Sequence, residues 1–364
     1  MRSRDLAALS FTILMSTGLH STLPYAATPA PGATTTAGMP LQLAGSTSLP
    51  EYKGDFDHFA ADVAGNRLFL AGEDGSTLEV FDLTSGKHLR TIKGFDQPHS
   101  PLYLPDLKRL VVTDSGAGMT RIVDASNYRI IGSIPLVVGA DPMLYDPSTR
   151  REYIVSVGKN ADPALPDTAV SAVDPRTGKK IGDITFNTDR VEAMAVEQDG
   201  NRLFINVTGR NTIAVVDKRT LKVLANWPIE GAKLNAAMAF DEAHQRLFVV
   251  TREPFKLLVL DAKDGRTIAS FDAPQRTDQV IFDRANQRVY ATGDDYTSVI
   301  QQKDPDHYDE VARVPTAKGA KTAVLVPERH TLFVAVSPGD SSVGGKLLRF
   351  NVLQNKGASG PAND

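Results

Sequence analysis

The 364-residue sequence contains no cysteine and only one tryptophan. Without cysteine the chain can form no disulfide, no thiolate-bound zinc site and no iron–sulfur cluster, and it offers no thiol nucleophile. The sequence also lacks the short motifs that select an enzyme class, including the Gly-x-Ser-x-Gly elbow, the phosphate-binding P-loop and the His-Glu-x-x-His zinc motif. No short motif therefore assigns the chain to an enzyme class.

Strong charge of either sign is absent as well. The formal net charge is −3 and no long basic run occurs. Nucleic-acid binding proteins carry a basic footprint, so bulk charge makes nucleic acid an unlikely partner while leaving a local basic patch open. We expect the partner to be a small molecule or a protein, and the protein to be a monomer.

The N-terminus contains the longest apolar run. Arg2 and Arg4 precede the run Leu6–Leu19, and the small residues Ala26-Ala27 follow it, which is the layout of a secretory signal peptide. The run spans about fourteen residues, shorter than a membrane-spanning helix needs. We therefore expect residues 1–27 to be a signal peptide, the mature chain to have no transmembrane segment, and the protein to be periplasmic or secreted.

Two segments are too poor in apolar residues to order themselves. Residues 28–40 are rich in Pro, Ala, Thr and Gly, and residues 354–364 are polar. Neither can bury enough apolar surface to offset the entropy of folding. We expect a flexible linker over 28–40 and a disordered tail over 354–364.

Between these segments one pattern recurs seven times. A polar residue, most often Arg, precedes a short apolar strand, with the next residue at positions 68, 110, 152, 203, 247, 289 and 332. Later in the unit an apolar pair ends in Asp, as at Asp82, Asp124, Asp174, Asp217 and Asp261, followed by turn residues. An Asp there accepts backbone N–H bonds in a turn, so we read this row as structural.

A repeat of about 40–45 residues with four antiparallel strands predicts a β-propeller. Seven copies predict an all-β, seven-bladed propeller over residues 41–353. The third copy is longer because it contains an insertion, Gly158–Thr168, between its second and third strands. The last copy lacks a fourth strand, whereas residues 41–50 look like one, so we expect this N-terminal strand to complete the last blade and close the ring.

The repeats carry a family resemblance. Asn-Arg-Leu-Phe at 201–204, with Val-Val-Asp at 215–217, resembles the YVTN-type repeat of YncE-like and surface-layer-associated β-propellers. The Tyr-Val-Thr-Asn core itself appears loosely, as in Leu110–Asp114. The Gly-His and Trp-Asp pairs of WD40 propellers are missing. The resemblance implies the propeller fold, and its YncE-like members add DNA binding as a further alternative.

In a propeller the first strand of each blade lines the central channel, so a ligand site is expected where these strands begin. Register places one polar residue there from every blade: His58, His99, Asp141, Glu192, Asn235, Asp278 and Lys321.

Several kinds of site fit these residues. Glu192, Asn235 and Asp278 offer oxygen ligands for a divalent ion such as Ca²⁺, similar to the site of gluconolactonase-like propellers, while His58 and His99 suit Zn²⁺. Equally, these side chains could be polar only because the channel mouth is wet. The sequence is compatible with both interpretations, a metal site and a solvated channel mouth.

Two further interpretations concern chemistry. Asp141 and Lys321, together with Arg210 and Arg252 at the ends of second strands, could bind a ligand, or the arginines could merely neutralise neighbouring acids. His58 or His99 could act as a general base with Glu192, giving a lactonase- or lyase-like enzyme. We favour a binding or scaffold protein that uses its channel face, with the enzyme as the alternative.

Overall fold

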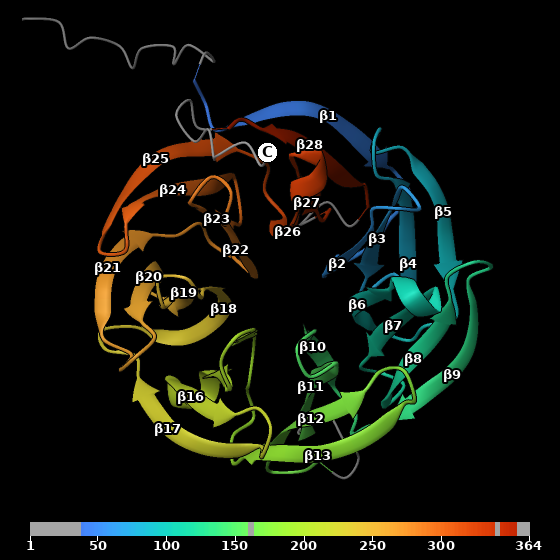
Figure 1. Ribbon diagram of the computed structural model, residues 1–364. Coiled ribbons are helices and arrows are strands. Elements are labelled where there is room, and N and C mark those ends of the chain that lie inside the picture. The colour runs from blue at the N-terminus through green and yellow to red at the C-terminus, as the bar shows by residue number, and fades with distance from the viewer. Residues whose placement is uncertain (1–37, 159–163, 339–342, 355–364) are drawn as a thin grey trace, which may run out of the picture. The chain divides into compact units, whose positions relative to one another are not determined.

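The computed structural model describes residues 38–158, 164–338 and 343–354. The chain divides into two units, and the first, Met1–Ala37, lies outside the described residues, as do the predicted signal peptide, most of the predicted linker and almost all of the predicted tail. The described residues form seven four-stranded antiparallel sheets arranged in a ring, the predicted seven-bladed propeller (Figure 1). No helix in this part of the chain is long and apolar enough to cross a membrane.

Each blade runs from an inner strand beside the channel to an outer strand at the rim (Figure 1). Blade 1 consists of β2 (Phe59–Asp62), β3 (Arg67–Gly72), β4 (Thr77–Asp82) and β5 (His88–Lys93). Blade 2 consists of β6 (Pro98–Leu104), β7 (Arg109–Asp114), β8 (Met119–Asp124) and β9 (Arg129–Pro135). Blade 3 consists of β10 (Ala140–Asp146), β11 (Arg151–Val157), β12 (Thr168–Asp174) and β13 (Lys179–Phe186). Blade 4 consists of β14 (Met194–Val196), β15 (Arg202–Val207), β16 (Thr212–Asp217) and β17 (Lys222–Pro228).

The remaining blades follow the same order. Blade 5 consists of β18 (Lys233–Asp241), β19 (Arg246–Glu253), β20 (Phe255–Asp261) and β21 (Thr267–Asp272). Blade 6 consists of β22 (Gln279–Asp283), β23 (Arg288–Thr292), β24 (Tyr296–Asp304) and β25 (His307–Pro315). Blade 7 consists of β26 (Ala320–Val326), β27 (Thr331–Val336), β28 (Gly345–Val352) and β1 (Leu41–Leu49). Three short 3-10 helices complete the described elements: η1 (Pro105–Leu107), η3 (Thr208–Arg210) and η4 (Pro327–Arg329).

The position of a strand in its blade explains its composition. The second and third strands are covered by the neighbouring blades on both faces, and β15 and β16 accordingly read as nearly continuous buried apolar runs. The outer strand β17 has no blade beyond it at the rim and is mostly exposed or half-buried. This layering reproduces the repeat seen in the sequence, because each blade must bury the same two strands.

The core of the ring lies between the blades. The described residues form seven clusters of buried apolar side chains, and each cluster joins two adjacent blades. Between blades 3 and 4, for example, Tyr153 and Val155 pack with Leu203 and Ile205. A single blade could not bury both of its faces, so the ring is stable only when it is closed.

The N-terminal strand closes the ring, as predicted. Strand β1 pairs antiparallel with β28, from Leu41 opposite Val352 to Leu49 opposite Gly345, and the two strands lie together in Figure 1. Leu41 and Leu49 are both buried in inter-blade clusters. Strand β28 therefore has no free edge in the described structure.

The recurrent Asp residues are turn residues, as predicted. Asp217 accepts hydrogen bonds from the backbone N–H groups of Arg219 (3.0 Å) and Thr220 (2.7 Å). The equivalent bonds run from Ser85 to Asp82 (2.7 Å) and from Ser126 to Asp124 (2.8 Å). These carboxylates hold the tight turns between third and fourth strands and take no part in a site at the channel.

Candidate functional site

A cavity of about 480 Å³ lies where the inner strands begin. Six of the seven residues that register placed at the channel mouth line it, and Arg252 from β19 lines it as well. Blade 5 contributes Arg252, and each other blade contributes one of the predicted mouth residues: His58, His99, Asp141, Glu192, Asp278 and Lys321.

Irregular pairing at the strand heads shapes this mouth. The ladder shifts between Pro98 and Pro101 in β6, between Ala140 and Met143 in β10, and between Ala320 and Thr322 in β26. A bulge leaves residues without a cross-strand partner and re-aims their side chains. His99, Asp141 and Lys321 lie within these shifts and line the cavity.

Two predicted residues do not join the cavity lining. Asn235 is fully buried, and its Nδ2 donates hydrogen bonds to Asn206 Oδ1 (2.7 Å) and Thr212 O (3.0 Å). Arg210 donates from Nη2 to Asn187 O (2.7 Å) at an exposed loop. These bonds hold Asn235 against β15 and β16 and Arg210 at the surface of the ring.

The guanidinium group of Arg252 lies beside Glu192 and Asp278, the other two predicted Ca²⁺ ligands. Arg252 Nη2 lies 2.5 Å from Asp278 Oδ1, and Arg252 Nη1 lies 3.9 Å from Glu192 Oε1. Glu192 also accepts a hydrogen bond from Arg190 Nε (2.8 Å). With Asn235 turned into the sheet and both carboxylates neutralised by arginine, this geometry does not assemble Glu192, Asn235 and Asp278 as a ligand set.

Lys321 is the buried cation of the mouth. Its Nζ lies within 4 Å of four carboxylates: Glu73 (3.4 Å), Asp278 (3.6 Å), Asp55 (3.8 Å) and Asp57 (3.8 Å). Burial alone would lower the pKa of Lys321, but the surrounding carboxylates outweigh it and raise the pKa. Lys321 is therefore a fixed positive charge that neutralises the acids contributed by blades 1 and 6.

His99 is held at both ring nitrogens. Its Nδ1 lies 2.6 Å from Asp57 Oδ2, and its Nε2 lies 3.0 Å from Ser115 Oγ. The order Asp–His–Ser is that of a hydrolytic triad. Burial alone would lower the pKa of His99, but the carboxylates of Asp141 and Asp57 raise it to about 10.

The charge of His99 decides what this arrangement can do. An imidazolium at neutral pH donates from both nitrogens and cannot accept a proton from Ser115, whose hydroxyl instead donates to Gln97 Oε1 (2.9 Å). Ser115 is buried and does not line the cavity. The geometry thus makes His99 a positioning group for Asp57 and does not favour the general-base role considered from the sequence.

Asp57 and Asp141 both lie beside His99. Burial alone would raise the pKa of Asp57, but interactions with His58, Lys321 and His99 lower it. Asp141 lies inside the channel, where burial by the surrounding protein raises its pKa to about 7. Even so, 36% of its side chain is accessible. Asp141 Oδ1 lies 3.4 Å from His99 Nδ1, the same nitrogen that pairs with Asp57, so a carboxyl group with a lowered pKa and one with a raised pKa both face one side of the imidazolium.

Three charged cavity residues were not predicted from the sequence: Asp57, Glu73 and Arg190. Asp57 immediately precedes His58, and Glu73 follows directly after the second strand of blade 1, β3. The Asp-His pair at 57–58 was a signal that could have been found, because adjacent residues at a strand entrance can both reach one site. Arg190 lies before β14 and left no signal in the repeat.

Deeper in the channel the lining becomes apolar. It includes Phe59, Leu102, Leu144 and the methionines Met143, Met194 and Met238. The cavity lining therefore includes both charged and apolar side chains.

Comparison with known proteins supports the fold alone. No family model matches the chain, and no curated protein matches it. Among solved structures the chain is similar to a chain of the Mitotic Checkpoint Complex (15% identity, TM-score 0.68, covering 92% of this chain and 100% of that one). It is also similar to a chain of Kuenenia stuttgartiensis Hydrazine Synthase (14% identity, TM-score 0.67, covering 89% and 99%). Because 1628 chains match in this way, likeness to any one of them selects no function.

Proposed function

We propose that this protein is a binding protein that holds a small polar ligand in the cavity at its channel mouth. One observation carries the proposal: side chains from all seven blades converge on a single cavity of about 480 Å³. This volume lies within the range of about 300–1,000 Å³ that small-molecule sites occupy. Solvation alone would explain polar residues at the rim, but it would not explain buried ion pairs between blades.

The lining defines the chemistry of the ligand. Lys321, His99 and Arg252 are cations already paired with acids at 2.5–3.4 Å, whereas the Asp141 carboxylate has one ion pair in the described structure, with His99 at 3.4 Å, and 36% of its side chain is accessible. Apolar side chains cover the wall below. A ligand with a cationic or metal-bound head and a short apolar body would fit this division.

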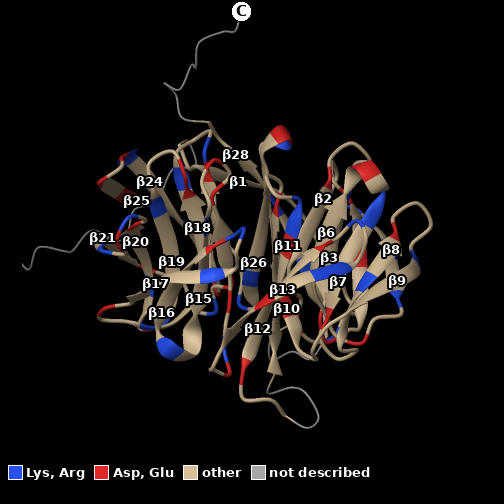
Figure 2. Ribbon diagram, turned by 60° about the horizontal axis from the view of Figure 1, so that its bottom comes forward, with Lys and Arg blue, Asp and Glu red and all other residues tan. Residues whose placement is uncertain are grey.

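Binding is favoured over the lactonase- or lyase-like alternative for a physical reason. The general base considered from the sequence is His58 or His99 acting with Glu192. Both nitrogens of His99 are engaged in hydrogen bonds, and His58 pairs with Asp57 instead of Glu192. Glu192 is paired with Arg190. A DNA-binding role finds no support in the surface charge, because Figure 2 shows acidic and basic positions interspersed over the ring, without a continuous basic stripe in this view.

The proposal includes a periplasmic or secreted location. Its support is the sequence of residues 1–27, which lie outside the described residues. N-terminal sequencing of the chain recovered from the periplasm or medium of an expressing bacterium tests it. A chain found only inside cells and beginning at Met1 would contradict this part of the proposal.

Methionine methyl NMR tests the binding site. Met143, Met194 and Met238 line the cavity, whereas Met39 packs between blades 6 and 7 and Met119 contacts Arg121. We expect members of a library of small polar fragments to shift the three cavity methyl signals and to leave those of Met39 and Met119 in place. Fragments that shift none of the cavity methyls, or all five equally, would contradict a site in the channel.

A further inference from the structure

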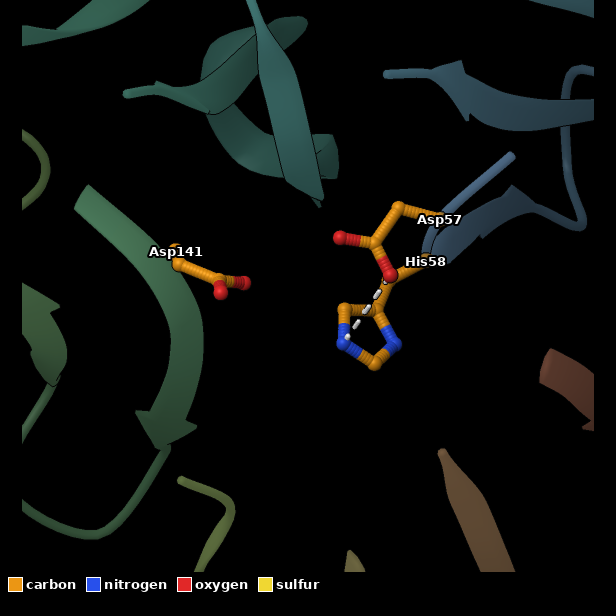
Figure 3. A group of neighbouring side chains, drawn as sticks. All are labelled: Asp57, His58 and Asp141. Carbon is orange, nitrogen blue, oxygen red and sulfur yellow. Dashed lines mark ion pairs between the residues drawn. The ribbon is translucent and has the colours of Figure 1, made fainter. Parts of the chain in front are cut away.

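Three side chains at the channel mouth bring potential metal-ligand atoms together. Asp57 and His58 lie directly before β2, and Asp141 is the second residue of β10. One carboxylate oxygen from each Asp and one ring nitrogen of His58 lie within 4.8 Å of one another. Figure 3 shows the Asp141 carboxylate facing the pair formed by Asp57 and His58 across the channel.

Asp57 has an acceptor atom without a hydrogen bond. Asp57 is 3% exposed, and its Oδ1 is buried with no hydrogen-bond partner in the described structure. The atom lies 3.6 Å from His58 Nε2, too far for a hydrogen bond. Leaving a buried carboxylate oxygen unsatisfied is costly, so this atom, which lies beside His58, points to a ligand at the Asp57–His58 pair.

We propose that Asp57 Oδ1, His58 and Asp141 bind a divalent transition-metal ion of the Zn²⁺ type. The inference rests on the proposed binding function and names one part of the cavity's ligand. Two carboxylates and one imidazole match the ligand types that zinc and its neighbours take, with three protein ligands leaving a further coordination position. That position opens onto the cavity, because His58 and Asp141 both line it.

His99 supplies the outer support for this site. Its Nδ1 donates to Asp57 Oδ2 (2.6 Å), which fixes the carboxylate and leaves Oδ1 directed toward His58. Outer hydrogen bonds of this kind orient metal ligands and are worth about 10–100-fold in affinity.

A second group, Asp57, Glu73 and His99, also has ligand atoms within 4.8 Å. It is the weaker candidate because both nitrogens of His99 are already engaged with Asp57 and Ser115. Lys321 Nζ also lies 3.4 Å from Glu73 Oε2, so an ammonium group already occupies that side.

The same ammonium lies 3.8 Å from Asp57 Oδ1 and opposes a metal at the proposed site. Glu73 and Asp278 are nearer to it, at 3.4 and 3.6 Å, so Lys321 has two closer acidic partners outside the proposed metal site. Lys321 therefore keeps two acidic partners when Asp57 binds a metal ion.

Zinc titration of the chelator-treated full chain tests the proposal. Competition with a chromophoric chelator gives the stoichiometry and affinity, and Co²⁺ substitution gives an absorption spectrum that reports the ligands. We expect one ion per chain, and we expect His58→Gln and Asp141→Asn each to weaken binding at least about tenfold, the lower end of what an outer-shell partner alone costs. Asp57 is left intact because its buried ion pairs support the fold.

His307→Gln is the matched control. His307 also pairs with an aspartate, at 2.9 Å from Asp304, but it is exposed at the rim, so its loss should leave zinc affinity unchanged. No binding, or binding unaffected by both cavity substitutions, would overturn the metal site. Fragment shifts of the cavity methyls in chelator-treated protein separate the two proposals: shifts without zinc binding would overturn the metal site alone, and the absence of both would overturn both.

Discussion

Arg252 Nη2 lies 2.5 Å from Asp278 Oδ1, so one ion pair joins the second strand of blade 5 to the entrance of blade 6. Both side chains are about four-fifths buried, with 22% and 21% of their surface exposed. Both residues line the cavity, so the pair bridges the two blades at its edge. It therefore contributes both to the charge balance of the mouth and to the cohesion of the ring.

Removing this guanidinium should destabilise the protein. We expect Arg252→Met to lower the free energy of unfolding by about 1–3 kcal/mol, between the values for exposed and for fully buried pairs, because Asp278 is left without its closest cation. Urea unfolding measures the change. Lys256→Met is the control, since Lys256 of the third strand, β20, pairs at 2.7 Å with the exposed Asp272 of the outer strand, β21, and its loss should cost less than about 1 kcal/mol. Equal losses in the two variants would contradict a structural role for the Arg252 pair.

Closure of the ring can be tested within a single strand. Leu41 of β1 is 2% exposed and packs between blades 6 and 7, whereas Leu43 in the same strand is 58% exposed. We expect Leu41→Ala to cost about 2–5 kcal/mol of unfolding free energy because it leaves a cavity in an inter-blade cluster. Leu43→Ala should change stability by no more than about 0.5 kcal/mol. If both variants unfold at the same urea concentration as the wild type, β1 does not close the ring in solution.

The sequence predicted the ring because every blade obeys the same physical demand. Two strands per blade are covered on both faces, so apolar runs, turn glycines and capping aspartates recur at a fixed period. The closing strand was predictable for the same reason, since the seventh repeat lacked an outer strand that Leu41–Leu49 could supply. The YVTN-type resemblance stays a prediction, because no family model matches the chain.

The site was only partly predictable, because it depends on contacts between blades. The strand register within one blade placed Asn235 at the mouth. In the structure Asn206 of the adjacent blade accepts a hydrogen bond from the Asn235 side-chain amide and holds that side chain away from the cavity. Periodicity also gave no reason to select Asp57, whose importance comes from His99 in blade 2. Such pairings between residues about 30–40 positions apart leave no mark on the repeat itself.

Glu152 breaks the repeat in a way that stability measurements can detect. It occupies the position where the other six blades carry Leu or Val, it is fully buried, and neither of its carboxyl oxygens has a hydrogen-bond partner in the described structure. Burial raises the pKa of Glu152 from 4.5 to about 8. We therefore expect Glu152→Leu to stabilise the protein at neutral pH, because an apolar side chain of similar size replaces a desolvated acid.

The pH dependence of this gain follows from the direction of the shift. Between pH 4.5 and about 8 the unfolded chain loses the Glu152 proton while the folded chain retains it. The free energy of unfolding therefore falls as the pH rises through this window, by up to about 1.4 kcal/mol per pH unit, and this contribution is constant outside it. The difference between Glu152→Leu and wild type should accordingly grow from pH 5 to pH 8 in urea unfolding. Glu152→Gln should remove the same pH dependence while still burying a polar group, and a difference that stays constant with pH in both variants would contradict a protonated Glu152 in the folded protein.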